Sequence, residues 1–120
     1  NVFAPCAEEE YTRVLKNDGV LCVAYAGPEH LMGLKRAIYD ETYENAARAD
    51  MPKSMRLLTE RRVRYDIQLD STEQILNLFS MTPYYWRTSE EDKRKLEGLS
   101  LLDTPVDIII AIYKKDRETV

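Results

Sequence analysis

The feature that most constrains the fold of this chain is the apolar run VLCVAYA, which spans residues 20–26 between Gly19 and Gly27. The run is too short for a helix that stands alone, and it lacks the polar alternation of a strand that faces water on one side. Such runs are typical of strands that are covered on both faces and pair in parallel with their neighbours. VLCVAYA therefore predicts a central, parallel strand.

Two further strands are indicated downstream. In RRVRYDIQL, residues 61–69, apolar and polar side chains alternate, and this period of two predicts a half-buried strand. The run VDIIIAIYKK, residues 106–115, is apolar and rich in β-branched side chains, and it predicts another buried strand. The apolar side chains of the alternating strand are Val63, Tyr65, Ile67 and Leu69.

Helical segments lie between these strands. Residues 7–19 carry three glutamates in the first turn and end at Gly19, which is typical of a short helix. Pro28 opens a predicted helix that runs to about Tyr43, and residues 45–54 are predicted to be a loop. The apolar face of that second helix consists of Leu31, Leu34 and Ile38.

Two capping boxes open the remaining helices. They occupy residues 71–74 and 88–91, and the later helix is expected to end near Gly98. The stretch MTPYYWRT, residues 81–88, joins the two helices. The order of elements indicates an α/β layered domain with about three strands and flanking helices.

Composition excludes several classes of protein. The net charge of -4 argues against a nucleic-acid binder that is held mainly by phosphate contacts. Two cysteines and one histidine fit a reduced intracellular protein and cannot form a structural zinc site by themselves. No apolar run is long enough to span a membrane. The charge is uneven, however, and a local basic stretch contains Lys53, Arg56, Arg61, Arg62 and Arg64.

Several motifs point to one family. Residues 14–21, VLKNDGVL, resemble the helix-turn-strand signature of class I S-adenosylmethionine-dependent methyltransferases, with Asn-Asp-Gly in place of a Pro-Gly-Gly turn. Residues 1–6 (NVFAPC), residues 27–35 (GPEHLMGLK) and residues 81–87 (MTPYYWR) follow in fixed order. Together they resemble the 23S ribosomal RNA (guanine-N1)-methyltransferases, the family that includes tylosin-resistance enzymes. The resemblance extends from Asn1 to about Lys115.

The resemblance implies the C-terminal half of a Rossmann-like class I methyltransferase sheet, with its last strand antiparallel. In that family a four-cysteine zinc module and a Gly-rich cofactor loop come first. Neither occurs in these 120 residues, whose four glycines are scattered. Residues 1–120 are therefore expected to form a single, partial methyltransferase domain that is inactive alone. The full enzyme is expected to transfer a methyl group from S-adenosylmethionine to N1 of a guanine in a 23S ribosomal RNA hairpin. It is expected to be cytoplasmic and to bind zinc only in the absent N-terminal module.

The resemblance also implies site residues. It places residues 1–5 at the carboxyl end of the fourth strand of the family's sheet, where Asn1 could orient a base and Phe3 could stack on a base or the cofactor. It favours contact between His30, expected in the first turn of its helix, and the cofactor or active site. For residues 1–5 the alternative is a loop at the end of a strand, with Phe3 in the core. For His30 the alternative is a purely structural role.

The aromatic stretch carries the predicted substrate contacts. Tyr85 and Trp86 could stack a flipped guanine, and Arg87 could bind a phosphate or a guanine edge. Arg62 and Arg64 would then be peripheral phosphate contacts. The alternative is a packing corner between two helices, with Tyr84 or Tyr85 buried. No catalytic residue is assigned, Cys6 is a weak nucleophile candidate, and Cys22 is expected in the core.

Two other function classes stay open. A small-molecule class I methyltransferase would share the turn and the buried strands but should lack the MTPYYWR motif and the basic stretch. A non-enzymatic module would self-associate, for example as a homodimer, through an exposed sheet edge.

Overall fold

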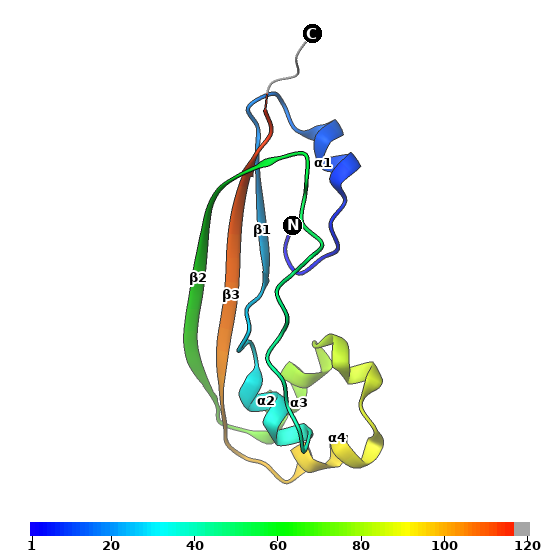
Figure 1. Ribbon diagram of the computed structural model, residues 1–120. Coiled ribbons are helices and arrows are strands. Elements are labelled where there is room, and N and C mark those ends of the chain that lie inside the picture. Colours follow the sequence, from blue (N-terminus) through cyan, green and yellow to red (C-terminus); the bar gives the residue numbers. More distant parts are fainter. Residues whose placement is uncertain (117–120) are drawn as a thin grey trace. The chain divides into compact units, whose positions relative to one another are not determined.

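The structure is a computed structural model that describes residues 1–116 (Figure 1). In chain order its elements are α1 (Glu8–Val14), β1 (Val20–Ala26), α2 (Met32–Ile38), β2 (Arg56–Leu69), α3 (Thr72–Ser80), the 3₁₀ helix η1 (Pro83–Arg87), α4 (Glu90–Glu97) and β3 (Leu102–Lys114). The chain forms two compact units. The first unit contains Asn1–Pro28, Asn45–Val63 and the segment that begins at Asp107; the second contains Glu29–Glu44 and Arg64–Val106.

The strands form a three-stranded sheet in the order β1-β3-β2, so that β3 lies between the other two in Figure 1. β1 and β3 are antiparallel, and their register pairs Val20 with Lys114 and Ala26 with Ile108. The predicted α/β class, the three strands and the antiparallel last strand are confirmed. The predicted parallel pairing of β1 is wrong for its ladder with β3, because an apolar run carries no information on the direction of its partner strand. One isolated parallel bridge, between Val2 and Ala24, lies outside that ladder.

Burial of β1 is one-sided. Leu21 and Val23 are buried, whereas Val20 and Cys22 on the opposite face are exposed. The predictions that both faces are covered and that Cys22 belongs to the core are therefore wrong. The covered face belongs to a small core of Leu21, Val23, Met55, Ala111 and Tyr113, against which Tyr11, Leu15, Tyr25 and Met51 pack.

β2 is a longer and more exposed strand than expected. It begins at Arg56, and its side chains are exposed as far as Asp66. Of the four predicted core-facing residues, Ile67 and Leu69 are half-buried, but Val63 and Tyr65 are exposed. The alternating pattern therefore located the strand correctly and was wrong about the burial of its first half.

Three helices build the core of the second unit. Residues of α2, α3 and α4 and the turn before α2 bury Leu31, Leu34, Ile38, Ile75, Phe79 and Leu96. Each such side chain contributes about 1.5–3 kcal/mol when it is fully buried. The cap predicted at Ser71 is confirmed, since its hydroxyl accepts a hydrogen bond from the amide of Gln74 at 3.1 Å. The cap predicted at Thr88 is one residue early: α4 is capped by Ser89, whose hydroxyl accepts from the amide of Asp92 at 3.1 Å. α4 is followed by Gly98 as expected.

The first two helices are shorter than their patterns suggested. α1 ends at Val14, and a turn leads into β1 with Asp18 at φ 64°, so an aspartate and not Gly19 adopts the left-handed conformation. α2 begins only at Met32 and ends at Ile38 rather than near Tyr43, because Tyr39 is extended. No helix within residues 1–116 is long and apolar enough to cross a membrane.

Candidate functional site

The predicted site residues fall into two groups, one in each unit. Asn1, Phe3 and Arg62 belong to the first unit. The second unit holds His30, Arg64, Tyr85, Trp86 and Arg87.

The N-terminal residues pair with β1. The amide of Ala24 donates to the carbonyl of Asn1 at 2.8 Å, and the amide of Phe3 donates to the carbonyl of Ala24 at 2.9 Å. The side chain of Asn1 closes the following turn by donating to the carbonyl of Pro5 at 3.0 Å and accepting from the amide of Ala4 at 3.2 Å. The segment is therefore held in a defined conformation beside β1.

Phe3 is 52% exposed, so the alternative that it belongs to the core is wrong. Its φ of 51° places a bulky residue in the left-handed region, a conformation that costs about 1–3 kcal/mol. Backbone strain of this kind is often found at ligand sites. The half-exposed ring beside the strand fits a planar ligand group.

A loop of residues 45–51 is tied to this segment. Arg48 donates from Nη2 to the carbonyl of Ala4 at 2.8 Å, and the amide of Cys6 donates to Asp50 Oδ2 at 2.8 Å. At its other end, Asn45 donates from Nδ2 to the carbonyl of Gly27 at 2.9 Å. The loop therefore has fixed attachments at both ends, although it contains no helix or strand.

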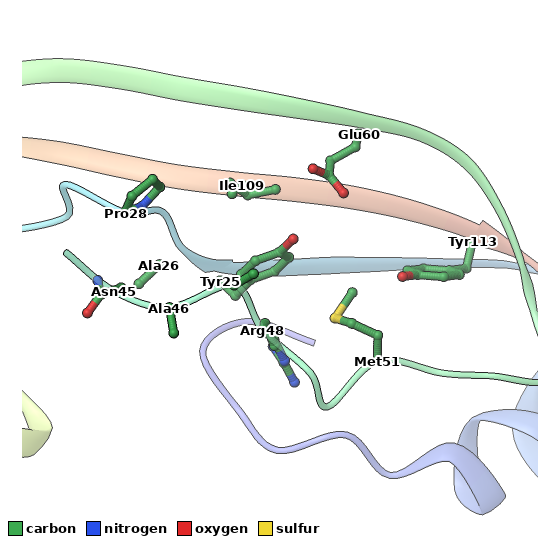
Figure 2. Close-up of a pocket in the computed structure, with 11 residues that line it drawn as sticks. Tyr25, Ala26, Pro28, Asn45, Ala46, Arg48, Met51, Glu60, Ile109 and Tyr113 are labelled. Atoms are coloured by element: carbon green, nitrogen blue, oxygen red, sulfur yellow. The ribbon is translucent and has the colours of Figure 1, made fainter.

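This loop and the sheet enclose a pocket of about 370 Å³ in the first unit (Figure 2). The strands contribute Tyr25, Ile109, Tyr113 and Glu60, and the loop contributes Arg48 and Met51 among others. In Figure 2 the hydroxyls of Tyr25 and Tyr113 and the carboxylate of Glu60 point toward the same space. This pocket could not be predicted from the sequence, because its walls come from segments far apart in the chain.

The pocket combines two protonated phenols with two charged groups. Burial raises the pKa of Tyr25 and of Tyr113, and the negative charge of Glu60 raises both further. Both side chains are therefore neutral hydroxyls that can donate or accept at neutral pH. The guanidinium of Arg48 lies 5.5 Å from the ring centre of Tyr25, a cation–π distance.

Arg62 makes a bidentate pair with a carboxylate that the sequence analysis missed. Its Nε donates to Asp107 Oδ1 at 2.8 Å and its Nη2 donates to Oδ2 at 2.7 Å. Asp107 is fully buried, whereas the side chain of Arg62 is 47% exposed. A methyl group at Gly27 would lie 2.5 Å from the Asp107 carboxyl, so only glycine leaves room for the pair. The one signal in the sequence was an aspartate inside a β-branched run.

In the second unit, Arg64 and His30 lie near the start of α2. Arg64 donates from Nε to Glu29 Oε2 at 2.7 Å, and both side chains are 40% exposed. His30 is half-buried and lies in the turn that precedes α2, which begins at Met32. The prediction that His30 occupies the first turn of the helix is therefore wrong.

The aromatic stretch MTPYYWRT forms η1 and joins α3 to α4 as predicted. The ring centre of Tyr85 lies 5.2 Å from that of Phe79, and Tyr84 lies 6.3 Å from Phe79. These two tyrosines are half-buried, which agrees with the packing-corner alternative. Trp86 is 84% exposed, so packing does not account for its indole.

Trp86 belongs to an exposed aromatic and basic group. Its ring centre lies 5.0 Å from that of Tyr85, with the ring planes nearly perpendicular at 88°. Lys93 places its ammonium 4.4 Å from the centre of the Tyr85 ring. The neighbouring Arg87 is exposed. We call Tyr85, Trp86, Arg87 and Lys93 the aromatic corner; together they offer a surface on which a base could stack beside positive charge.

No protein-family model matches the chain. Over 96% of its length the chain is 29% identical to YxjB of Bacillus subtilis (strain 168), a protein named as a candidate 23S rRNA (guanine-N(1)-)-methyltransferase. The chain is similar to a named rRNA methyltransferase. The resemblance inferred from the motifs is thereby confirmed, and it supports a methyltransferase family for the chain. The chain spans 42% of the length of YxjB, so the match concerns part of that protein.

Proposed function

We propose that this chain is part of an S-adenosylmethionine-dependent methyltransferase that methylates N1 of a guanine in 23S ribosomal RNA. The observation that carries the proposal is the similarity to YxjB along 96% of the chain. The proposal includes a Rossmann-like sheet, of which residues 1–120 form a partial domain. It is supported by the antiparallel last strand and by the parallel bridge between Val2 and Ala24.

The cofactor would supply an electrophilic methyl group, and the chain's own residues would hold and orient the ligands. Open α/β sheets bind ligands beyond the carboxyl ends of their strands. Phe3 lies beside β1 with its ring half exposed, which suits a planar group of the cofactor or a base. The assignment of His30 to the cofactor and of Asn1 to the base rests on the family resemblance. Catalysis would depend mainly on holding two ligands in reactive geometry.

The aromatic corner would contact the RNA. A tryptophan that is 84% exposed leaves most of its apolar surface in water, and stacking on a base recovers about 1–3 kcal/mol. Arg87 adds positive charge, and Lys93, which also pairs with Glu90 at 3.3 Å, adds a second cation, so a local contact is compatible with a net charge of -4 for the chain. A small-molecule methyltransferase would have no use for such a surface.

A chimera tests the proposal directly. This chain would replace the matching segment of YxjB, and methyl transfer from tritium-labelled S-adenosylmethionine to 23S rRNA transcripts would be measured. Primer extension would locate the product, because a methyl group on guanine N1 blocks base pairing. We expect label in the RNA and a stop at a guanine. A chimera that is folded by circular dichroism and leaves the RNA unlabelled, while YxjB labels it, would contradict the proposal.

Two variants test the aromatic corner in the same chimera. Trp86→Ala should weaken RNA binding by about tenfold, as expected for the loss of one stacked base. Tyr43→Ala is the matched control, since Tyr43 is another exposed aromatic residue of the second unit. Equal RNA affinity of the two variants would remove the corner from the RNA contact.

The isolated chain provides a second test. Because its four glycines are scattered and form no Gly-rich loop, we expect no tight binding of S-adenosylmethionine by calorimetric titration and no activity. Tight binding would show that a complete cofactor site lies within these 120 residues.

A further inference from the structure

We propose that the pocket of the first unit binds a guanine base, and that Glu60 is the residue that selects guanine over the other bases. The inference rests on the proposed function and adds to it a location within this chain for a guanine of the RNA. In this assignment the aromatic corner of the second unit stacks a different base.

The size and walls of the pocket suit a nucleobase. Its volume of about 370 Å³ lies in the range of small-ligand sites. Ile109 and Met51 provide apolar contact, and the rings of Tyr25 and Tyr113 provide flat aromatic surface. Unstacked RNA bases are typically held by aromatic rings and by guanidinium planes. Arg48, 5.5 Å from the ring centre of Tyr25, supplies such a plane.

Glu60 gives the pocket its chemical preference. It is on β2, it points into the pocket, and within residues 1–116 its carboxylate makes no ion pair or hydrogen bond. An ionised carboxylate offers only acceptors, and its two oxygens can accept from two neighbouring donors. The Watson–Crick edge of guanine presents two such donors, N1–H and the N2 amino group. Adenine, cytosine and uracil do not present two neighbouring donors on that edge, so each would place at least one acceptor against the carboxylate.

The pocket is also connected to the segment that the proposed function assigns to the base. Arg48 forms part of the pocket wall and donates to the carbonyl of Ala4. Ala4 lies two residues after Val2, which makes the parallel bridge with Ala24 of β1. Asn45, at the other end of the loop, is held by the carbonyl of Gly27. These attachments are made by the chain's own residues and hold the loop beside the tyrosines, an arrangement that lowers the cost of ordering the site on binding.

Nucleotide titrations followed by NMR test the inference on the 120-residue chain. We expect guanosine monophosphate to shift the resonances of Tyr25, Asn45 and Glu60 and to bind at least about tenfold more tightly than the adenosine, cytidine and uridine monophosphates. Inosine monophosphate lacks the N2 amino group and should bind several-fold more weakly than the guanosine compound. Equal binding of guanosine and adenosine monophosphates, or no binding at millimolar concentration, would overturn the proposal.

Two isosteric variants isolate the carboxylate. Glu60→Gln keeps the size of the side chain and should lose about tenfold in affinity for guanosine monophosphate together with the preference over adenosine. Glu9→Gln makes the same charge change on exposed α1, outside the pocket, and should leave both unchanged. Circular dichroism would show that both variants are folded. Unchanged guanine preference in Glu60→Gln would refute the role of this residue.

The methyl-transfer assay separates this proposal from the proposed function. If the chimera methylates RNA and Glu60→Gln leaves its kcat/KM unchanged, the guanine pocket is wrong while the function stands. If the chimera does not methylate RNA but the chain binds guanosine monophosphate through Glu60, the pocket stands and the function is wrong.

Discussion

Replacing Arg62 by alanine removes the guanidinium that holds the fully buried carboxylate of Asp107. The two groups are joined by hydrogen bonds of 2.8 Å and 2.7 Å in a bidentate arrangement. A buried carboxylate that loses its cation keeps its desolvation penalty, whereas an arginine that loses its carboxylate can turn to water. We therefore expect Arg62→Ala to destabilise the fold more than the loss of an exposed ion pair would.

The magnitude follows from the burial of the two partners. Breaking a fully buried pair by removing one partner costs about 3–5 kcal/mol. Asp107 meets that condition, but the side chain of Arg62 is 47% exposed and its charge is partly screened. The expected loss in the free energy of unfolding is therefore about 2–3 kcal/mol. Asp107→Asn keeps the shape and one acceptor, and it should cost about 1–2 kcal/mol.

Urea unfolding followed by circular dichroism measures these differences. Arg61→Ala is the matched control, because Arg61 is an exposed arginine on the same strand and, within residues 1–116, makes no ion pair. It should change the free energy of unfolding by no more than about 0.5 kcal/mol. The double variant Arg62→Ala with Asp107→Asn should cost less than the sum of the single variants. An Arg62→Ala protein as stable as Arg61→Ala would refute the reasoning.

Three further predictions concern single side chains. Burial raises the pKa of the Tyr84 hydroxyl from about 10 to about 12. The stability that comes from keeping this phenol protonated is therefore complete below pH 10 and is lost as the pH rises toward 12. Tyr84→Phe should remove that part of the alkaline loss of stability in thermal unfolding. Burial and neighbouring carboxylates raise the pKa of Cys6, which lowers its thiolate fraction. Iodoacetamide at pH 8 should therefore alkylate the exposed Cys22 first. Faster labelling of Cys6 in peptide mass spectra would contradict this prediction. A methyl group at Gly33 would collide with the backbone of β3, so Gly33→Ala should lower the free energy of unfolding by about 1–3 kcal/mol. The control is Gly98→Ala, whose new methyl group would have its nearest neighbour at 3.9 Å, and it should be neutral or stabilising. Equal effects of the two substitutions would contradict the packing argument.

The sequence predicted local structure well where the determining groups are close in the chain. Helix caps depend on a hydroxyl and an amide three residues apart; the cap at Ser71 was predicted correctly, and the second was predicted one residue early, at Thr88 instead of Ser89. The β-branched run of residues 106–115 located the central strand β3. Burial was predicted less well, because it depends on what covers a strand. Cys22 and Val63 lie in apolar patterns and are nevertheless exposed.

The pocket could not be predicted from the sequence, for a related reason. Tyr25 and Tyr113 come together only through the antiparallel register of β1 and β3, in which Tyr25 pairs with Ile109 and Leu21 with Tyr113. Glu60 joins them from β2. Nothing in the sequence near any of these residues distinguishes a pocket wall from an ordinary strand position. Phe3 and Trp86, by contrast, could be proposed as ligand contacts from the sequence because they lie in short motifs, and both are exposed.

The basic stretch illustrates how pairing changes the meaning of a charge. In the sequence, its arginines are equivalent candidates for phosphate contacts. The structure gives Arg62 a bidentate partner in Asp107 and Arg64 a partner in Glu29. A phosphate would have to displace a carboxylate from either one, which offsets much of the gain from the new contact. Within residues 1–116, Arg61 and Arg87 are exposed and make no ion pair, so either one could contact a phosphate without that cost.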